Sequence, residues 1–165
     1  MIETDLQDIE IHTDLRPGNI GEIIALHGKL YAAAYGWDAT FEAYVAEPLA
    51  QFAKRQGYRE RLWIVKHRGH VAGSIAIVEA SPFDAQLRWF LLHPDLRGRG
   101  LGRKLITDAI AFCRSRGYTS IHLWTAGRLT SAIRLYQSVG FILTEEVLHE
   151  LWGDLIREQR YDLRL

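Results

Sequence analysis

One cysteine, no excess of either charge and no long apolar run set the first limits on this chain of 165 residues. Its single cysteine, Cys113, cannot close an internal disulfide, which excludes a small disulfide-stapled fold. Lysine plus arginine and aspartate plus glutamate both total 20, so no overall charge attracts nucleic acid or a membrane surface. Because neither a signal peptide nor a membrane-length apolar run is seen, we expect a cytoplasmic protein without nucleic-acid or membrane partners.

Metal-binding patterns, repeats, low-complexity segments and long linkers are missing as well. His67 and His70 are close in sequence, but they flank a predicted turn with no other ligand type nearby, so we expect no metal site. A chain of this length buries an ordinary core without staples. We therefore expect residues 1–165 to form a single domain.

Short apolar strands and amphipathic helices alternate along the chain. The periodicity predicts strands at 7–13, 61–67, 71–79, 87–92, 120–125, 142–147 and 160–165. It predicts helices at 20–35, 39–54, 98–116 and 130–138, with Pro48 as a kink or a break. A strand, a helix and a second strand of this length call for parallel pairing through a right-handed crossover. The whole pattern predicts one α/β or α+β domain around a mixed sheet.

A glycine-rich segment directly after the strand at 87–92 is the most informative part of the sequence. Three glycines in five positions, Gly98, Gly100 and Gly102, would be costly inside a helix. At a helix start they let main-chain N–H groups face a ligand with no Cβ in the way, and the helix end adds partial positive charge. Four basic side chains lie among these glycines: Arg97, Arg99, Arg103 and Lys104. The segment predicts a phosphate-binding site, with a glycine- and arginine-rich surface turn as the alternative.

Two common nucleotide-binding patterns do not fit this segment. A P-loop needs Gly-Lys-Ser/Thr, whereas Arg103, Lys104 and a leucine follow the last glycine. A Rossmann fingerprint needs a glycine at position 103 and normally lies near the start of a βαβ unit. The pattern Arg/Gln-x-x-Gly-x-Gly/Ala is met by Arg97, Gly100 and Gly102. The segment therefore resembles the acetyl-CoA pyrophosphate loop of the GNAT superfamily of acyl-CoA N-acyltransferases.

A second motif covers residues 132–141, Ala-Ile-Arg-Leu-Tyr-Gln-Ser-Val-Gly-Phe. It is similar to the Ala-x-x-Leu-Tyr-x-x-x-Gly-Phe segment of GNAT enzymes, and its Tyr136 lies 34 residues after Gly102. Other residues resemble the acetyltransferase domain fused behind MarR-type regulators in bacteria: His27-Gly28, Leu30-Tyr31, Tyr35-Gly36-Trp37, Leu87-Arg88, Leu123-Trp124-Thr125, His149 and Trp152-Gly153-Asp154. One departure is Leu129, where many GNAT enzymes carry an asparagine whose contact is not carried over.

The resemblance implies the GNAT fold, a central mixed, mostly antiparallel sheet of about six or seven strands flanked by about four helices. Its parallel pair, the fourth and fifth strands, is splayed. The resemblance also implies acetyl-CoA as the donor, CoA as the product and no metal. The residues that it places on the donor are Leu91 and Leu92 through their backbone, and Arg97, Gly98, Arg99, Gly100, Leu101, Gly102, Arg103 and Lys104.

The catalytic groups are less completely specified. Tyr136 matches the tyrosine that protonates the departing thiolate in this family, and the alternative is a core tyrosine with a satisfied hydroxyl. No motif marks the general base. The candidates for it are Glu79, His149, Glu150 and Asp154. Cys113 lies on the apolar side of its helix, so we expect a buried thiol and not a nucleophile.

Aromatic and basic side chains are the candidates for an acceptor pocket. Tyr31, Tyr35 and Trp37 carry aromatic rings with polar tips, which either pack together or form the wall of such a pocket. Arg88 lies on an otherwise apolar strand and needs a partner, either a structural carboxylate or the carboxylate of an amino-acid-like acceptor. Trp124 would line the cleft from the next strand or pack in the core.

Together these residues and the resemblance predict an N-acetyltransferase that moves an acetyl group from acetyl-CoA to the primary amine of a small molecule. The amine would attack directly, without a covalent enzyme intermediate. A protein or peptide N-terminus is the competing acceptor. A non-catalytic acyl-CoA-binding sensor or interaction module is the alternative from another class. The final strands of this fold often pair in dimers, so a homodimer is also compatible with the resemblance.

Overall fold

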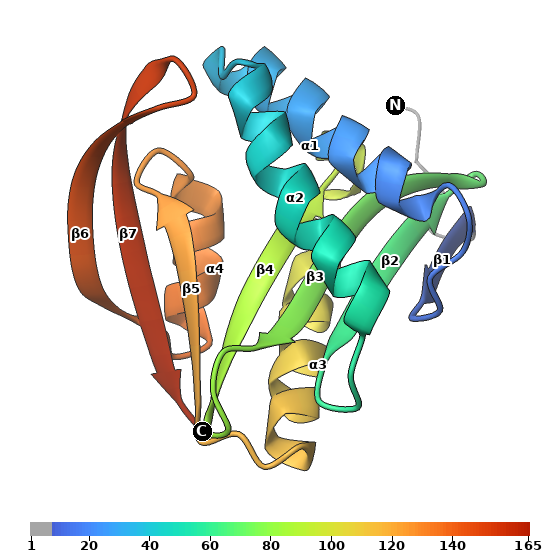
Figure 1. Ribbon diagram of the computed structural model, residues 1–165, viewed down its shortest axis with the longest axis vertical. Helices are drawn as coiled ribbons and strands as arrows, with labels where there is room; N and C mark the ends of the chain where they lie inside the picture. The colour runs from blue at the N-terminus through green and yellow to red at the C-terminus, as the bar shows by residue number, and fades with distance from the viewer. Residues whose placement is uncertain (1–7) are drawn as a thin grey trace.

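The computed structural model describes residues 8–165 as one seven-stranded sheet with helices on both faces (Figure 1). The strands are β1 (Ile9–His12), β2 (Arg61–His67), β3 (His70–Glu79), β4 (Asp84–Leu92), β5 (Ser120–Ala126), β6 (Ile142–Leu151) and β7 (Asp154–Arg164). The α-helices are α1 (Asn19–Tyr35), α2 (Ala39–Arg55), α3 (Leu101–Ser115) and α4 (Thr130–Ser138), and a 3-10 turn spans Pro94–Leu96. Within these residues no helix is both long and apolar enough to cross a membrane.

The sheet has the strand order β1-β2-β3-β4-β5-β7-β6, and every neighbouring pair is antiparallel except β4 and β5. The parallel pair is short, because its register ends where Gln86 lies opposite His122. Beyond that point β4 continues to Leu92 and β5 to Ala126 without pairing to each other. The predicted mixed sheet with a splayed parallel pair is therefore confirmed.

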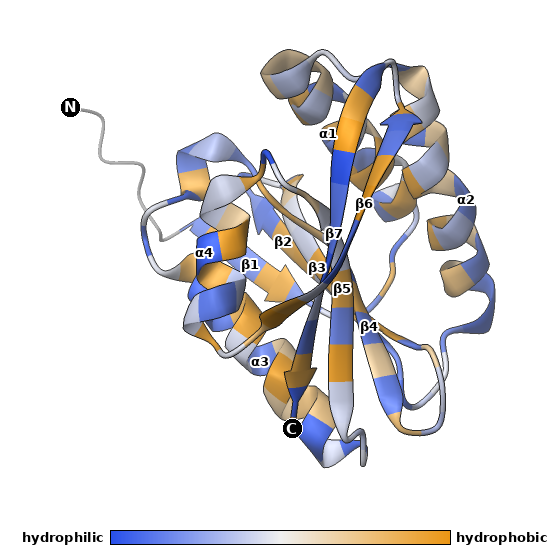
Figure 2. Cartoon of the chain, turned by 90° about the vertical axis from the view of Figure 1, so that its left-hand side faces the viewer, coloured by the Kyte–Doolittle hydropathy of each residue, from blue (hydrophilic) through white to orange (hydrophobic). Residues whose placement is uncertain are grey.

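Two helical layers cover the two faces of the sheet. Figure 2 shows α1 and α2 on one side of the strands and α3 and α4 on the other. The first layer packs around Ile23, Leu49 and Phe52, and the second around Leu105 and Ile106, all of them completely buried. Burial of these apolar side chains on both faces is the main force that holds the helices to the sheet.

Helix α2 runs unbroken through Pro48, so the expected break is wrong, and the kink that the sequence predicts as the other outcome stays a prediction. The Asp38 side chain caps its first turn by accepting a hydrogen bond from the Thr40 N–H at 2.9 Å. Val45 and Leu49 lie on either side of the proline and are buried against the sheet. Their packing offsets the hydrogen bond that proline cannot donate.

The last two strands are much longer than the sequence predicts. Strands β6 and β7 form a hairpin whose turn is Trp152-Gly153, with φ of 56° and 79°. Two successive positive φ values match the turn type that suits the twist of a two-residue hairpin. Most side chains of β6 are exposed, so the sequence lacks the alternation that marks a strand. At the other end β1 begins at Ile9, and the predicted strand residue Gln7 lies outside the described residues.

Candidate active site

A β-bulge in β4 opens the sheet beside the glycine-rich segment. Trp89 has a φ of 47°, and the pairing register between β3 and β4 shifts between Ser74 and Ala76. The buried Ser74 hydroxyl donates a hydrogen bond of 2.6 Å to the Trp89 carbonyl oxygen. Because the bulge bends β4, residues 90–92 diverge from β5 instead of pairing with it. These three residues line a cavity on that side of the strand.

The glycine-rich segment forms the start of α3 as expected. Gly98 and Gly100 have φ values of 73° and 81°, and no side chain caps the first turn of the helix. The first N–H group of α3 with a helical partner is that of Lys104, which donates to the Gly100 carbonyl oxygen at 3.0 Å. Among residues 8–165, the N–H groups of residues 101–103 have no helical partner and are therefore available to a ligand. Backbone donors beside a helix N-terminus fit the oxygens of a pyrophosphate.

The basic side chains of this segment are only partly committed to internal contacts. Arg97 donates through Nε to the Leu92 carbonyl oxygen at 2.9 Å, which ties the loop to the end of β4. Arg103 donates to the Ser138 hydroxyl at 2.9 Å, and Lys104 forms an ion pair with Asp108 at 2.7 Å. Both contacts are solvent-exposed, so they cost little to rearrange around an anionic ligand.

A cavity of about 400 Å³ extends from this loop along the opened strand. It is bordered by the ends of β4 and α1, by the starts of α3 and α4, and by Leu92, Arg97, Gly98 and Arg103. Tyr35, which the sequence places among the acceptor residues, lines this larger cavity instead, beside Arg128. A charged mouth and an apolar inner wall suit a ligand with phosphates at one end and a flexible apolar arm at the other.

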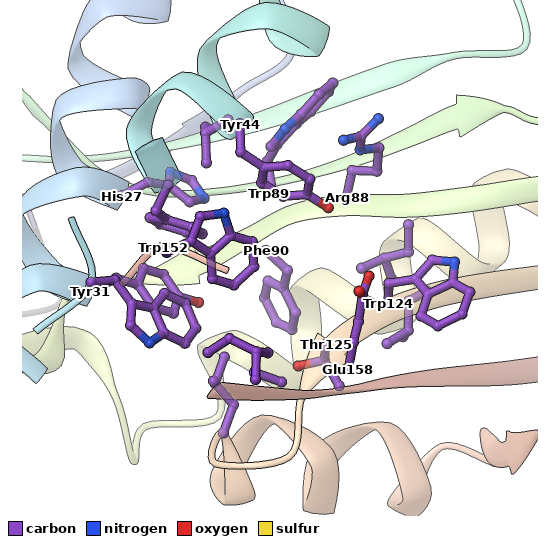
Figure 3. A pocket seen from close by; sticks show the side chains of 18 of the residues that line it. His27, Tyr31, Tyr44, Arg88, Trp89, Phe90, Trp124, Thr125, Trp152 and Glu158 are labelled. Atoms are coloured by element: carbon purple, nitrogen blue, oxygen red, sulfur yellow. The ribbon is translucent and has the colours of Figure 1, made fainter. Parts of the chain in front are cut away.

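A second, smaller cavity of about 120 Å³ adjoins the first and shares Tyr31, Phe90 and Leu129 with it (Figure 3). Its walls come from α1, α2, β4, β5 and the β6–β7 hairpin. Of the predicted acceptor residues, Tyr31, Trp37, Arg88 and Trp124 line it. The structure therefore brings together residues that are almost a hundred positions apart in the chain.

Aromatic side chains make up one end of the small cavity. Trp37 packs on Tyr31 at 5.1 Å between ring centroids and on Trp152 at 4.7 Å. Phe41 lies against Trp152 at 4.9 Å. Tyr31 and Trp37 therefore pack together and also line the small cavity, and their role in binding the acceptor stays a prediction. The Trp37 indole N–H is buried without a hydrogen-bond partner among residues 8–165.

Arg88 has no carboxylate partner within the described part of the chain. Its guanidinium lies over the Trp89 ring at 4.9 Å and beside the Tyr44 hydroxyl (Figure 3). Burial lowers the pKa of Arg88, and the neighbouring Tyr44 hydroxyl acts in the opposite direction. A guanidinium that is partly desolvated and still lacks an anion is a ready binding site for one.

Tyr136 lies between the two helical layers, where α4 meets the splayed strands. Its ring is 6.1 Å from that of Phe90 and 6.0 Å from that of Phe141, and the side chain borders the small cavity. Burial raises the pKa of Tyr136 far above its ordinary value, and the nearby Tyr31 adds to that effect. The phenol is therefore protonated at neutral pH.

His27 borders the same cavity and is a further polar-tipped ring of α1, which the sequence predicts to pack with Tyr31 or to form part of an acceptor pocket. Its Nδ1 donates to the Ile23 carbonyl oxygen at 2.8 Å, so the neutral ring presents Nε2 as an acceptor. Burial lowers the pKa of His27 to about 4. The ring is therefore uncharged at neutral pH.

The candidates for a general base are distributed unevenly around the site. Glu79 pairs with Arg59 at 3.0 Å, Asp154 pairs with Arg128 at 2.6 Å, and neither borders the small cavity. His149 lies 3.4 Å from Glu158, which does border it. Glu158 was not predicted as a site residue, because the last strand predicted from the sequence begins only at position 160 whereas β7 begins at Asp154.

Cys113 is completely buried in the core between α3 and the sheet, as expected. Burial raises the pKa of its thiol to about 12. The thiol is therefore protonated and inert at neutral pH. Among the described residues, no group of three or more His, Cys, Asp or Glu side chains is placed to hold a metal ion.

Comparison with known proteins identifies this arrangement. The fold is that of an acetyltransferase from Streptococcus agalactiae, with a TM-score of 0.76 and 21% identity over 96% of this chain and 99% of that one. A spermidine N-acetyltransferase from Vibrio cholerae, solved with CoA and spermine, has a TM-score of 0.71, with 20% identity over 95% of each chain. The same architecture occurs in the acetyltransferase yncA of Salmonella typhimurium with acetyl-CoA, at a TM-score of 0.71 and 19% identity over 95% of this chain and 94% of that one.

Sequence similarity then gives the family. Residues 29–141 match the model of the acetyltransferase (GNAT) family. An uncharacterized N-acetyltransferase of Schizosaccharomyces pombe is 30% identical over 72% of this chain and 74% of its own length. The uncharacterized N-acetyltransferase YjgM of Escherichia coli is 33% identical, with coverages of 67% and 69%. The chain belongs to the GNAT family of acetyltransferases.

Proposed function

We propose that this acetyltransferase moves the acetyl group of acetyl-CoA to the primary amine of a small molecule by direct attack. The observation that carries the proposal is the junction of the two cavities at Tyr31, Phe90 and Leu129. A thioester that enters along the larger cavity would face an amine held in the smaller one. Proximity of this kind supplies much of the rate of a transfer between two substrates.

The donor side is supported by the chemistry of the loop. The N–H groups of the α3 start, the two αL glycines and Arg97 offer donors to a pyrophosphate, and the backbone at Leu91 and Leu92 borders the path of the arm. The Salmonella neighbour with the same fold holds acetyl-CoA. The residues present therefore fit this donor.

Tyr136 is proposed as the proton donor to the departing thiolate. Its raised pKa keeps the phenol protonated at neutral pH, and its ring lies beside Phe90 at the junction. As negative charge develops on the sulfur, a protonated phenol can donate a hydrogen bond and then its proton. This role also fits a phenol that borders the small cavity.

The acceptor that we propose carries a carboxylate beside its amine, as an amino acid does. Arg88 presents a partly desolvated guanidinium to the small cavity and has no internal anion among residues 8–165. Such a group would attract a carboxylate bidentately and repel a polyamine. The Vibrio neighbour binds spermine, so the two proteins would differ in acceptor class.

Thermal unfolding with added ligands tests the donor, and CoA release tests the transfer. A ligand at a hundred times its Kd adds about 2.7 kcal/mol of stability. We expect acetyl-CoA and CoA, but not ATP or NAD, to raise the melting temperature. With acetyl-CoA present, amino acids should release CoA, whereas polyamines and peptides should release little. Stabilisation without release by any amine would favour the non-catalytic acyl-CoA-binding module, and release by peptides alone would favour a protein acceptor.

A further inference from the structure

We propose that Glu158 binds the acceptor's ammonium group and takes its first proton, and that His149 passes this proton to solvent. The inference rests on the proposed transfer to an amine. It adds a catalytic residue to the small cavity, where Glu158 is the only carboxylate among the described residues that line the wall.

Glu158 lies near the start of β7, opposite Ala126 of β5 and Val147 of β6. Figure 3 shows its carboxylate directed into the cavity between Phe90 and Trp124, on the side facing Arg88. Its side chain is 24% exposed, so it is neither a free surface group nor a fully desolvated one. A carboxylate with partial access to a cavity is well placed to meet a cationic amine.

His149 links this carboxylate to solvent. Its Nε2 lies 3.4 Å from the Glu158 carboxylate, and its side chain is 44% exposed on β6, the edge strand of the sheet. The two groups therefore form a path of one step from the cavity to water. An imidazole has two ring nitrogens, so it can accept a hydrogen bond or proton at one and donate from the other, which suits His149 for that position.

No permanent cation neutralises Glu158 among residues 8–165. Arg160, its neighbour on β7, is held by Asp162 through two hydrogen bonds of 2.9 Å. Arg88 on β4 and Tyr44 on α2 face the cavity with it, without a recorded ion pair to Glu158. Strand β5 contributes Trp124, Thr125 and Ala126, which carry no titrating group there. The cation that completes this site is therefore the ammonium of the acceptor.

Arg88 and Glu158 give the small cavity a positive and a negative wall. An amino-acid-like acceptor carries the complementary pair of charges. Its carboxylate would face Arg88, and its amine would face Glu158. The pair therefore fixes the direction in which the acceptor binds.

The proton balance of the transfer assigns each group a task. The ammonium loses one proton to Glu158, and the nitrogen lone pair then forms the C–N bond to the acetyl carbonyl carbon. The C–S bond breaks, and the thiolate takes the proton of Tyr136. The second proton of the nitrogen restores the tyrosine, directly or through water. Glu158 returns to its carboxylate form when its proton leaves through His149.

The test compares Glu158→Gln and His149→Asn with Glu47→Gln, an exposed carboxylate on α2 outside both cavities. Loss of a general base commonly costs at least about 100-fold in rate, so we expect kcat/KM of Glu158→Gln to fall by about that factor at pH 7. The fall should shrink as pH rises, because the amine then arrives without its extra proton. The kcat/KM of His149→Asn should fall less, and that of Glu47→Gln should match the native protein.

Two further readouts separate this role from a structural one. Glu158→Gln should keep the acetyl-CoA-induced rise in melting temperature and lose calorimetric binding of the acceptor. A Glu158→Gln protein with native kcat/KM and an unchanged acid limb of the pH profile would overturn the inference. So would an equal loss of stabilisation by acetyl-CoA. If the native protein transfers acetyl to no amine, the proposed function fails, whereas amine binding still tests Glu158.

Discussion

Ser74 and Trp89 are joined by a 2.6 Å hydrogen bond from the serine hydroxyl to the tryptophan carbonyl oxygen, at the position where β4 turns away from β5. Trp89 has a φ of 47°, a conformation that costs a bulky residue about 1–2 kcal/mol. The hydroxyl satisfies a carbonyl that the bulge removes from the sheet ladder. The shape of the site therefore depends on a serine that contacts neither cavity.

Ser74→Ala should destabilise the protein by about 1–3 kcal/mol, because it leaves the buried Trp89 carbonyl oxygen unsatisfied. Urea unfolding measures this change. Ser115→Ala, which removes a helix-end hydrogen bond made by an exposed serine, should stay within about 0.5 kcal/mol of the native protein. Equal stability of the two variants would show that the hydroxyl does not support the bulge.

Tyr136→Phe should lower kcat by about 100-fold, because the thiolate then departs without its proton donor. The ring contacts with Phe90 and Phe141 remain, so stability and the acetyl-CoA-induced rise in melting temperature should change little. Steady-state assays of CoA release measure kcat. An unchanged kcat would leave Tyr136 as a core residue only.

Arg88→Lys should raise KM for a carboxylate-bearing amine by about tenfold or more, since a charged hydrogen bond contributes about 1.5–3 kcal/mol and lysine cannot bind bidentately. For an amine without a carboxylate, KM should stay level or fall. Arg16→Lys, at an exposed ion pair with Asp14, is the matched control and should leave KM unchanged. Equal effects on both kinds of amine would contradict the proposed carboxylate site.

Gly100→Ala should weaken acetyl-CoA binding. An added Cβ meets no atom within 4 Å, but the φ of 81° strains any non-glycine residue by about 1–2 kcal/mol. Gly69→Ala, with a φ of 80° in the β2–β3 turn and equally open space, should lose similar stability and keep its affinity for acetyl-CoA. Calorimetric titration with acetyl-CoA measures the affinity of each variant. Equal affinities would mean that the α3 start does not hold the donor.

Acid should destabilise the protein through His27. Burial lowers the pKa of His27 to about 4, below its ordinary value of 6.5, so the unfolded chain binds more protons between these values. The free energy of unfolding therefore decreases as pH falls from 6.5 toward 4, because the buried His27 ring resists protonation. The decrease is about 2 kcal/mol at pH 5. Urea unfolding at pH 7 and pH 5 should show this slope, and His27→Gln should flatten it. An equal slope in the variant would assign the loss to other groups.

The donor side of the site could be predicted from sequence because its residues are neighbours in the chain. The stretch 97–104 carries its own glycines and charges, and a local motif needs no knowledge of the fold. Most helices and inner strands were also predictable, since burial leaves a clear period in them. The likeness to domains fused with MarR-type regulators, the cytoplasmic location and the homodimer stay predictions.

The acceptor side could not be predicted in the same way. Tyr44, Trp152 and Glu158 meet only after α2 packs on the sheet and the last hairpin forms. Strand β6 is mostly exposed and therefore lacks the pattern that announces a strand, and the left-handed φ of Trp89 contradicts the ordinary preference of tryptophan. Tertiary packing decided these features.

The hydrogen bond from the Asp38 N–H to the Trp152 carbonyl oxygen, 3.0 Å long, joins the α1–α2 connection to the tip of the last hairpin. The acceptor wall thus draws on two segments from opposite ends of the sequence, whereas the donor loop is contained in its middle. In the proposed acceptor site, substitutions in those two segments would change which amine is selected, and the proposed donor loop would hold the thioester as before. The acceptor specificity of this enzyme could therefore be changed, in evolution or by design, by replacing the β6–β7 tip and the α1–α2 connection together.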